Sequence, residues 1–384
     1  MKEPRHPNYV CVHAGQLEDD LYGGATAPMY TSTAYDYRRP GTNLYPRYFN
    51  TPNQVALSKK IAALEHTEAG LIFGSGMAAI SAVFMAYLKS GDHIIMQRAI
   101  YGGTSHFASA EFEHLGIEFS MLEHITKETL EASLQDNTKM VYIETPSNPL
   151  LEITDMEVVA AFAKANSLTS AIDNTFASPI NQNPALFGID IIIHSATKYL
   201  GGHSDICAGT VSAGQDAIDH IWKTAKNYGG SLSDQTVWLL ERSIKTLGLR
   251  VKTQSKNAKK LAKFLEKHPN VEQVNYPGLK SHPQHQLAKS QMHGYGGMMS
   301  FVLKNNIQQD DFLEELEVIK PALSLAGVES TILAPSTTSH SLLTPEEREQ
   351  QGISDRLLRF SVGIEEVDVL ISDLEQAMEK SRKK

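Results

Sequence analysis

The sequence predicts an α/β protein with a mostly parallel central sheet, followed by a smaller α+β domain. Between about residues 55 and 210, short apolar runs alternate with segments of helical periodicity. Several of these runs are apolar throughout, which is typical of strands that helices cover on both faces. The chain of 384 residues is also longer than one hydrophobic core usually supports. We therefore expect at least two domains.

The elements of the larger domain follow from this alternation. We expect strands at 71–73, 93–96, 140–143, 170–172 and 189–193, and helices at 77–88 and 156–165. Strands and helices that alternate at this spacing are typical of crossover units, which build parallel sheets.

The composition divides the chain into three parts. Residues 1–50 are rich in Pro, Gly, Tyr and Thr and lack periodicity, which predicts an extended arm that packs on another surface. Residues 51–245 are expected to form the larger domain, and residues 246–384 the smaller one. Around and beyond this boundary we expect a long helix through Trp238 to Leu247, an amphipathic helix at 252–267, strands at 297–303 and 357–362, and a closing helix at 367–378.

Charge and composition narrow the functional classes. The net charge is −9 and the basic residues are scattered, which argues against a nucleic-acid partner. No apolar run reaches the ~18 residues of a membrane span, and the first residues lack the apolar stretch of a signal peptide. Two cysteines give neither a disulfide framework nor metal-ligand spacing. We therefore expect a cytoplasmic protein without a membrane or metal partner.

Lys198 follows an apolar strand and stands among hydroxyl groups and glycines, in Ser195-Ala-Thr-Lys-Tyr-Leu-Gly-Gly202. Ligands of parallel sheets bind at the carboxyl ends of the strands, so Lys198 is expected at a binding site. A lysine flanked by Ser195 and Thr197 suits a Schiff base beside a phosphate. A lysine after a strand is by itself more often a surface residue, so the neighbouring residues carry this prediction.

Two further segments indicate what the lysine would bind. Phe73-Gly-Ser-Gly-Met-Ala-Ala79 combines a strand, a glycine-rich turn and a helix start, whose free amides can hold a phosphate. The third glycine of a dinucleotide fingerprint is missing, and the two glycines could equally serve the turn alone. Asp173 ends a strand 25 residues before Lys198. A carboxylate there can pair with the protonated ring nitrogen of pyridoxal 5′-phosphate (PLP), although an isolated aspartate is more often a cap.

With these residues in view, the chain resembles the Cys/Met metabolism family of PLP-dependent enzymes. This family contains cystathionine γ-synthase, the cystathionine lyases, methionine γ-lyase and the O-acylhomoserine sulfhydrylases. The resemblance runs from Val12 to the final helix and is carried by seven segments in one order: Tyr45-Pro-Arg47, Gly74-Ser-Gly-Met77, Tyr101-Gly-Gly-Thr104, Glu144-Thr-Pro-Ser-Asn-Pro149, Asp173-Asn-Thr175, Ser195-Ala-Thr-Lys-Tyr-Leu200 and Arg359-Phe-Ser-Val-Gly363.

The resemblance implies the type I fold of PLP-dependent transferases, like that of aspartate aminotransferase, and it implies roles for individual residues. Lys198 would bind PLP as a Schiff base and transfer protons, with Tyr101 as a second catalytic group. The expected cofactor contacts are Gly76, Met77, Ser195 and Thr197 to the phosphate, Asp173 to the ring nitrogen, Tyr101 to the ring face and Asn148 to the ring hydroxyl. Arg359 would bind the substrate α-carboxylate with two hydrogen bonds, and Ser324 would orient the lysine and that carboxylate.

The resemblance also implies an oligomer. Tyr45 and Arg47 lie in the predicted arm, and in this family they reach the phosphate bound by the neighbouring subunit. We therefore expect a homotetramer built from two dimers, which acts on a small amino-acid substrate.

The reaction implied is γ-elimination from a sulfur amino acid of the methionine, homocysteine or cystathionine type, releasing a thiol, 2-oxobutyrate and ammonia. A γ-replacement transferase, either an O-acylhomoserine sulfhydrylase or a cystathionine γ-synthase, is the alternative. A cystathionine β-lyase is less favoured, as is an inactive relative, since no motif is lost.

Three positions depart from the pattern of the relatives. Enzymes that bind cystathionine usually carry an arginine near His106 and a glutamate at Leu323. Without these groups, a charged distal end of the substrate would lack partners, which favours a short, uncharged γ-substituent. Methionine γ-lyases often have a cysteine at Gly103, so the match to that subgroup is incomplete.

Overall fold

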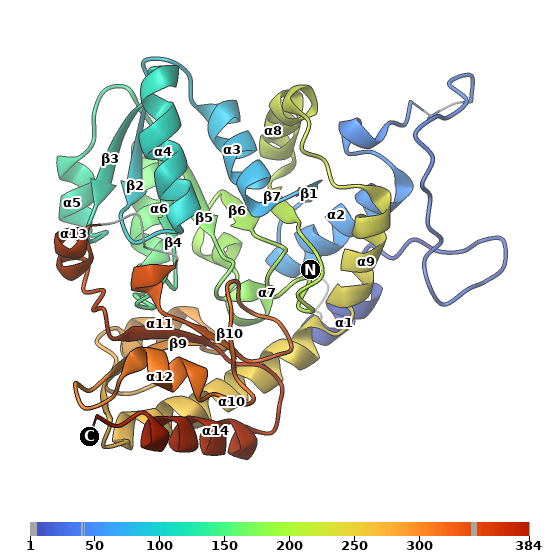
Figure 1. Cartoon of the computed structure of the whole chain (residues 1–384). Helices are drawn as coiled ribbons and strands as arrows, with labels where there is room; N and C mark the ends of the chain where they lie inside the picture. The colour runs from blue at the N-terminus through green and yellow to red at the C-terminus, as the bar shows by residue number, and fades with distance from the viewer. Residues whose placement is uncertain (1–5, 40, 42, 339–343, 384) are drawn as a thin grey trace.

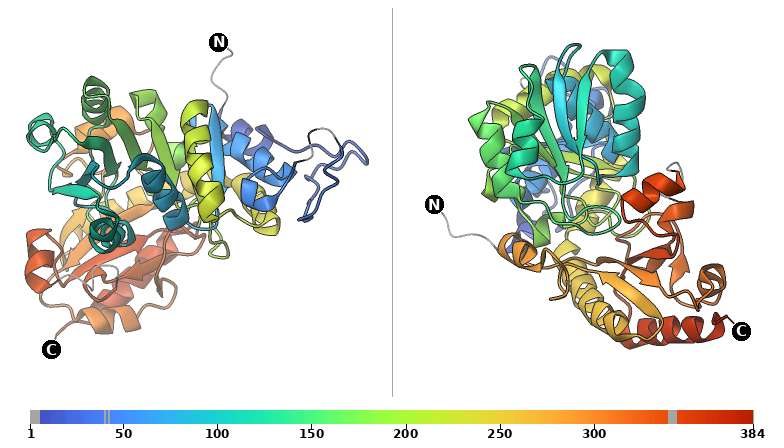
Figure 2. Two further views of the ribbon diagram at one scale, coloured as in Figure 1. Left: turned by 90° about the horizontal axis from the view of Figure 1, so that it is seen from above. Right: turned by 90° about the vertical axis from the view of Figure 1, so that its left-hand side faces the viewer.

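The structure is a computed structural model that describes residues 6–39, 41, 43–338 and 344–383 (Figure 1). A larger domain built on a seven-stranded sheet adjoins a smaller domain built on a five-stranded sheet. Part of the N-terminal segment projects away from both domains, as the left view of Figure 2 shows.

The large sheet has the strand order β1-β7-β6-β5-β4-β2-β3. The five strands from β6 to β3 are parallel, whereas β7 pairs antiparallel with both β6 and β1. The prediction of a mostly parallel sheet is therefore confirmed. The strands are β1 (Ala69–Phe73), β2 (His93–Gln97), β3 (Glu118–Leu122), β4 (Thr138–Glu144), β5 (Thr169–Asp173), β6 (Ile191–His194) and β7 (Gly209–Ala213).

Helices cover both faces of this sheet, so its central strands are apolar on both sides. In β6, Ile191 and Ile193 pack with one helical layer and Ile192 packs with the other. The first layer contains α3 (Gly76–Tyr87), α4 (Gly102–Leu115) and α8 (Gln215–Tyr228); the second contains α5 (Lys127–Ala132) and α6 (Met156–Ala165). A third cluster joins α2 (Pro52–Glu65), α7 (Ser178–Asn181) and α9 (Asp234–Ile244) to the sheet edge.

The smaller domain has the strand order β10-β11-β12-β9-β8, antiparallel except for the pair β10 and β11. Helices α10 and α14 pack against each other in this domain, and their apolar side chains join the strands in one core. Its elements are α10 (Leu247–Lys267), β8 (Val271–Asn275), α11 (His285–Gln291), β9 (Met298–Leu303), α12 (Gln309–Glu314), β10 (Lys320–Pro321), β11 (Thr331–Leu333), α13 (Pro345–Gln350), β12 (Leu357–Ser361) and α14 (Val367–Lys380).

The long helix predicted through Leu247 is wrong, because α9 ends at Ile244 and α10 begins at Leu247. The break has a tertiary cause. Arg250 of α10 is buried and donates through Nη2 to the carbonyl of Ser243, 3.0 Å away, and through Nε to Oγ1 of Thr246, 3.2 Å away. The side chain thus satisfies a carbonyl at the end of α9 that a continuous helix would have used.

The N-terminal segment is only partly the extended arm that its composition predicts. It begins with the helix α1 (Pro7–His13), whose buried Val10 and Cys11 pack towards α2 of the larger domain and α10 of the smaller one. Beyond α1 the chain projects outward, with Leu21, Tyr22 and Tyr37 each more than three quarters exposed. It returns through the short helix η1 (Pro46–Tyr48).

Candidate active site

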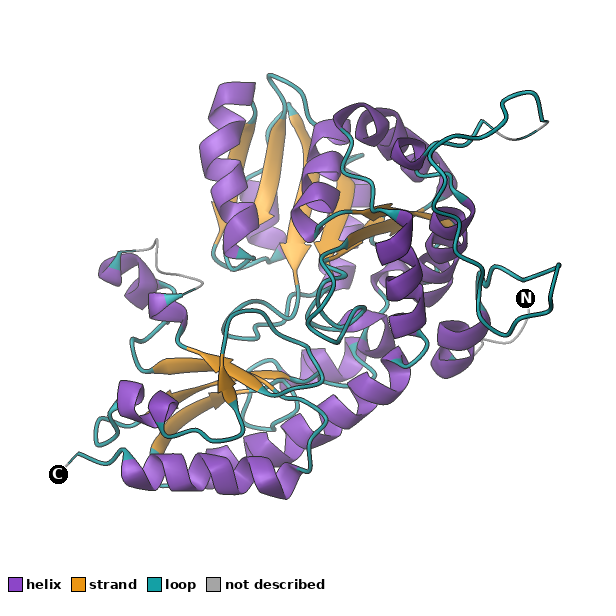
Figure 3. Ribbon diagram, turned by 45° about the vertical axis from the view of Figure 1, so that its right-hand side comes forward, coloured by secondary structure: helices purple, strands orange, loops and turns teal. Residues whose placement is uncertain are grey.

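The site lies where the carboxyl ends of the parallel strands of the large sheet face the smaller domain (Figure 3). Tyr101 follows β2, Asn148 follows β4, Asp173 ends β5 and Lys198 follows β6. Parallel strands present their carboxyl ends at one edge, so these four residues converge although the sequence separates them.

Lys198 connects the two domains. Its Nζ donates a hydrogen bond to Oγ of Ser324, 2.8 Å away. Burial, with the positive charge of Arg359 as a second cause, lowers the pKa of Lys198 to about 8. A lysine with this pKa carries much more neutral amine near pH 7 than an exposed lysine does, which makes it a better nucleophile.

Arg359 lies on β12 beside Ser324. It is 5% exposed, and it donates through Nη1 to Oδ1 of Asn148, 3.1 Å away, and through Nη2 to the carbonyl of Ser324, 3.0 Å away. Both acceptors are neutral, and no carboxylate in the described part of the chain lies within ion-pair distance of the guanidinium. Burial lowers the pKa of Arg359 to about 10 although Glu144 and Tyr101 oppose this. The positive charge is therefore available to an incoming carboxylate.

Ser324 has a left-handed backbone with φ of +75°. This conformation is uncommon for a residue with a side chain and costs on the order of 1–3 kcal/mol. The bonds from Lys198 and Arg359 to its Oγ and carbonyl hold the residue in place.

The segment predicted to bind a phosphate lies at the start of α3. Ser75 caps the helix by accepting from the amide of Ala78, 3.0 Å away. A Cβ on Gly76 would lie 2.8 Å from Cβ of Ser195, so glycine is required for Ser195 to sit this close to the helix start. The amide of Ser195 is in turn bonded to Oγ1 of Thr175, 2.8 Å away.

The remaining predicted phosphate contacts adjoin this turn. Oγ1 of Thr197 is bonded at 3.1 Å to the main chain of Ala208. The side chain of Met77 on α3 accepts a weak hydrogen bond from Thr104 of α4, with the sulfur 3.9 Å from Oγ1. The helix start, a serine and a threonine are thus grouped as a phosphate dianion needs.

Asp173 is 5% exposed and accepts from the amide of Thr175, 2.9 Å away. Burial raises its pKa, while Thr175 and the nearby His194 act in the other direction. A buried carboxylate needs a cationic partner to stay charged, and the described residues supply none within ion-pair distance. A protonated ring nitrogen would supply one. Together with the helix start and Lys198, this fits PLP.

Tyr101 lies at the start of α4 with 47% of its surface exposed. Its amide donates to Oε2 of Glu144, 2.7 Å away. A Cβ on Gly103 would lie 2.4 Å from Cε1 of the Tyr101 ring, so a larger residue there would displace the ring. His106 is exposed on α4, and Leu323 is exposed next to Ser324.

Tyr45 and Arg47 are not brought to this site within one chain. Arg47 lies on η1 and donates through Nη1 to the carbonyl of Lys226 at the end of α8, 2.5 Å away. Its guanidinium lies near the rings of Tyr45 and Tyr48. No hydrogen bond or ion pair in the described part of the chain links Tyr45 or Arg47 to Lys198.

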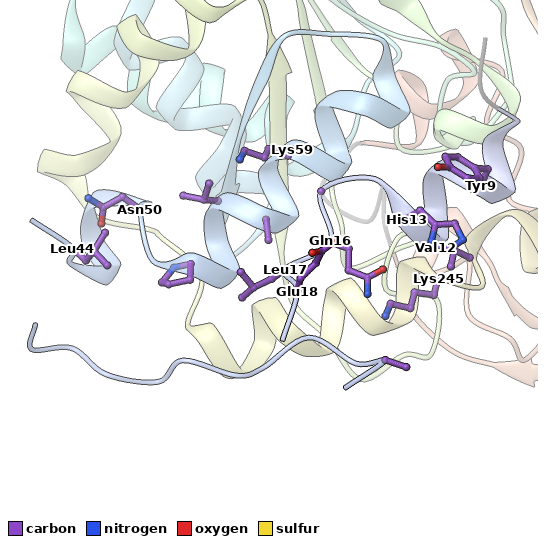
Figure 4. Close-up of a pocket in the computed structure, with 15 residues that line it drawn as sticks. Tyr9, Val12, His13, Gln16, Leu17, Glu18, Leu44, Asn50, Lys59 and Lys245 are labelled. Atoms are coloured by element: carbon purple, nitrogen blue, oxygen red, sulfur yellow. The ribbon is translucent and has the colours of Figure 1, made fainter. Parts of the chain in front are cut away.

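A hollow of about 990 Å³ lies elsewhere, between α1, the projecting arm and the start of α2 (Figure 4). Its lining includes Tyr9, His13, Glu18, Lys59 and Lys245, and none of the residues around Lys198. The chemistry of the lysine site makes that site, and not this hollow, the candidate active site.

Two residues of the site had no role in the sequence-based prediction. Thr175 bonds both Asp173 and Ser195, and Glu144 bonds Tyr101. Both lie in the segments that carry the family resemblance. Their position at or just after a strand end, like that of Asp173, was the signal that could have singled them out.

In the described part of the chain no three histidine, cysteine, aspartate or glutamate residues are grouped so that they could hold a metal ion. None of the described helices is long and apolar enough to cross a membrane.

A mostly parallel sheet that presents a half-buried lysine, a buried aspartate and a glycine-rich helix start at one edge defines the class of PLP-dependent enzymes of fold type I. The family model described as "Cys/Met metabolism PLP-dependent enzyme" matches residues 8–379. The chain belongs to this family.

Curated relatives of similar identity carry three different names. The chain is 42% identical over 373 residues to the cystathionine gamma-lyase of Bacillus subtilis strain 168, covering 96% of this chain and 98% of that protein. It is 41% identical over 373 residues to the cystathionine beta-lyase of Lactococcus lactis subsp. cremoris strain MG1363, with the same coverage. It is also 41% identical over 386 residues to the L-methionine gamma-lyase of Fusobacterium nucleatum subsp. nucleatum, covering 97% of each.

A solved structure agrees with the fold. Cystathionine gamma-lyase from Lactobacillus plantarum, complexed with L-serine, superposes with a TM-score of 0.94 at 39% identity, covering 98% of this chain and 99% of that one. The predictions of fold class, family and PLP as cofactor are confirmed. So is the reaction class, a PLP-dependent carbon–sulfur lyase.

Proposed function

We propose that this enzyme catalyses γ-elimination from a sulfur amino acid, releasing a thiol, 2-oxobutyrate and ammonia. The observation that carries the proposal is the group formed by Lys198, Ser324 and Arg359. It joins a nucleophilic amine to a guanidinium that no carboxylate of the described chain neutralises. An amino acid carries its carboxylate on the α-carbon, so the guanidinium could bind the carboxylate while the amine acts at the α-carbon.

The residues divide into those that hold PLP and those that hold the substrate. Lys198 would hold PLP covalently, with Asp173 at its ring nitrogen, Asn148 at its ring hydroxyl and Tyr101 on its ring face. The phosphate would be held by Gly76, Met77, Ser195 and Thr197 at the start of α3 and after β6. Arg359 would hold the substrate α-carboxylate, with Ser324 between it and the lysine. When bound, PLP supplies an electron sink for charge that develops at the α-carbon.

Two residues then move protons. Nζ of Lys198 would take the proton from the α-carbon of the substrate. After passing that proton on, Nζ of Lys198 would also accept the proton that the β-carbon loses. The bond between Cγ and sulfur would then break, and the hydroxyl of Tyr101 would give the leaving sulfur its proton. Addition of water to the remaining four-carbon unit yields 2-oxobutyrate and ammonia. The partly exposed Tyr101 ring at the start of α4 suits a group that meets a departing substituent.

The residues beside the γ-position favour a short, uncharged substituent. Leu323 is 69% exposed next to Ser324 and presents an apolar surface. A substrate with a second amino-acid head would leave charged groups unpaired against such a surface. We therefore place methionine and homocysteine before cystathionine.

We also propose that the enzyme is a cytoplasmic homotetramer built from two dimers. Tyr45 and Arg47 would reach the phosphate of the neighbouring subunit. Support comes from their position outside the lysine site, from the exposed Leu21, Tyr22 and Tyr37 of the arm, and from the hollow beneath it. Cys11 and Cys207, both free thiols, suit a reducing compartment.

The test is 2-oxobutyrate release by the purified, PLP-loaded protein. The substrates are L-methionine, L-homocysteine, L-cystathionine, and O-acetyl-L-homoserine with sulfide. Lys198→Ala should abolish release, and Lys260→Ala, at an exposed lysine of α10, should not change it.

Release from methionine or homocysteine supports the proposal. Formation of homocysteine from O-acetylhomoserine and sulfide, without elimination, would establish a replacement transferase instead. Pyruvate from cystathionine would establish β-elimination.

A further inference from the structure

Glu144 and Asp173 are two buried carboxyl groups in register on neighbouring parallel strands. Glu144 ends β4, Asp173 ends β5, and the two residues are paired in the sheet. They are 3% and 5% exposed. Adjacent strands lie only ~4.8 Å apart. Two carboxylates this close in a buried site disfavour each other's charge, so one of them tends to keep a proton.

The surroundings favour Glu144 as the group that keeps it. Burial, followed by the charge of Asp173, raises the pKa of Glu144 well above its ordinary value. The backbone amides of Tyr101 and Asn148 and the guanidinium of Arg359 act in the opposite direction but do not outweigh these two causes. The charge of Asp173 is favoured by two hydrogen bonds from Thr175 and by His194. PLP would add a cation directly to Asp173, and Glu144 has no ion-pair partner among the described residues.

The charged and titratable groups facing Glu144 come from four elements. They are Asp173 on β5, Arg359 on β12, Tyr101 at the start of α4 and Tyr142 on β4 itself. Burial, Asp173 and Glu144 raise the pKa of Tyr142 well above its ordinary value, so this phenol is neutral. Arg359 is then the one cation among these groups. If Glu144 were ionised, its negative charge would interact with the guanidinium of Arg359.

We propose that Glu144 is a positioning residue that stays neutral in the PLP-loaded enzyme. Its carboxyl oxygen holds the backbone of Tyr101, 2.7 Å away, at the start of α4. Its neutrality leaves the charge of Arg359 to the substrate carboxylate. The second part rests on the proposed function, in which Arg359 binds that carboxylate.

The first experiment measures the protonation state without any reaction. Infrared spectra of the PLP-loaded wild type at neutral pH should contain a protonated-carboxyl band that is missing in Glu144→Gln. Glu152→Gln is the matched control, because Glu152 is a partly buried glutamate of the same domain outside the site. If the spectra of wild type and Glu144→Gln contain the same protonated-carboxyl bands, the proposal is wrong. This result is independent of which substrate is turned over.

The second experiment measures binding of L-methionine by the absorbance of bound PLP between neutral and alkaline pH. At neutral pH the apparent dissociation constant of Glu144→Gln should stay within about threefold of the wild type, because an uncharged amide replaces an uncharged acid. At alkaline pH the wild type should lose about tenfold more affinity than the variant, because only the wild type gains an anion beside Arg359. Equal losses in both proteins would overturn the role of Glu144 towards Arg359.

A third variant, Glu144→Asp, tests the bond to Tyr101 and remains informative if the amide variant does not fold. The shorter side chain keeps the acid but withdraws it from the Tyr101 amide. We expect kcat to fall about tenfold, the cost of a lost buried hydrogen bond, with a smaller change in KM. An unchanged kcat would show that the contact does not position Tyr101.

Discussion

Arg359→Lys is the substitution that most directly tests how the substrate is held. The guanidinium now donates through two nitrogens, 3.1 Å to Asn148 and 3.0 Å to Ser324. An ammonium group has the same charge but cannot offer two parallel bonds to a carboxylate. Loss of one charge-assisted bond costs about 1.5–3 kcal/mol. Since ~1.4 kcal/mol is tenfold in an equilibrium constant, kcat/KM for methionine should fall about 10- to 150-fold.

The assay compares L-methionine with L-methioninamide, which lacks the carboxylate. The variant should lose activity towards the acid and much less towards the amide, which already binds without the two-bond contact. Arg356→Lys is the control, because Arg356 lies just before β12 and pairs with Glu272, 2.6 Å away, outside the site. Equal losses for the acid and the amide would refute the assignment of Arg359 to the carboxylate.

Three further predictions follow from the same geometry. The apoprotein should bind PLP faster as the pH rises to about 8, the pKa of Lys198, and no faster above it. A lysine with a pKa of about 8 has roughly 300 times more neutral amine at pH 7 than a lysine with a pKa of 10.5. Stopped-flow absorbance measures the rate, and a rate that keeps rising until pH 10 contradicts the prediction. The pKa of Lys198 is lower in the folded apoprotein than in the unfolded chain, so unfolding takes up a proton between about pH 8 and 10.5. The free energy of unfolding should therefore rise with pH across this window. Urea titrations would measure this rise, which should be absent in the Lys198→Ala variant. Gly103→Cys should displace the Tyr101 ring and lower kcat about tenfold, which corresponds to roughly 1.4 kcal/mol of lost positioning. The control is Gly91→Ala, at a turn glycine, whose kcat is measured in the same assay. Equal losses of kcat in the two variants would argue against the contact between residue 103 and the ring.

The parts of the site that lie on the large sheet could be predicted from local sequence. Asp173 and Lys198 each follow an apolar run, and the carboxyl ends of parallel strands meet at one edge. Ser324 and Arg359 could be placed only through the family resemblance. Ser324 is 126 residues from Lys198 in sequence, and its bond to the lysine depends on how the two domains pack. Residue spacing along a chain carries no information on such packing.

The fold was predicted less well where polar residues are buried. Strand β7 contains Thr210 and Ser212, which are buried, between small residues, so its pattern resembles a loop. Its antiparallel pairing with β6 and β1 was therefore not anticipated. The helix α1 was not predicted because its two buried residues, Val10 and Cys11, are too few to show a helical period. The helix is stabilised by its packing on α2 and α10, which local sequence does not reveal.

The division between rigid and exposed parts of the site explains why the family is clear while relatives of equal similarity differ in reaction. Apart from Tyr101, the groups assigned to PLP lie at or after strand ends of the large sheet or at the start of α3. The groups assigned to the γ-substituent are Tyr101, exposed at the start of α4, and Leu323, exposed in the smaller domain. Substitutions there cost the fold little, because few neighbours depend on them. We therefore expect the choice between elimination and replacement to depend on the exposed groups. Whole-chain similarity is dominated by the buried residues and does not report on it.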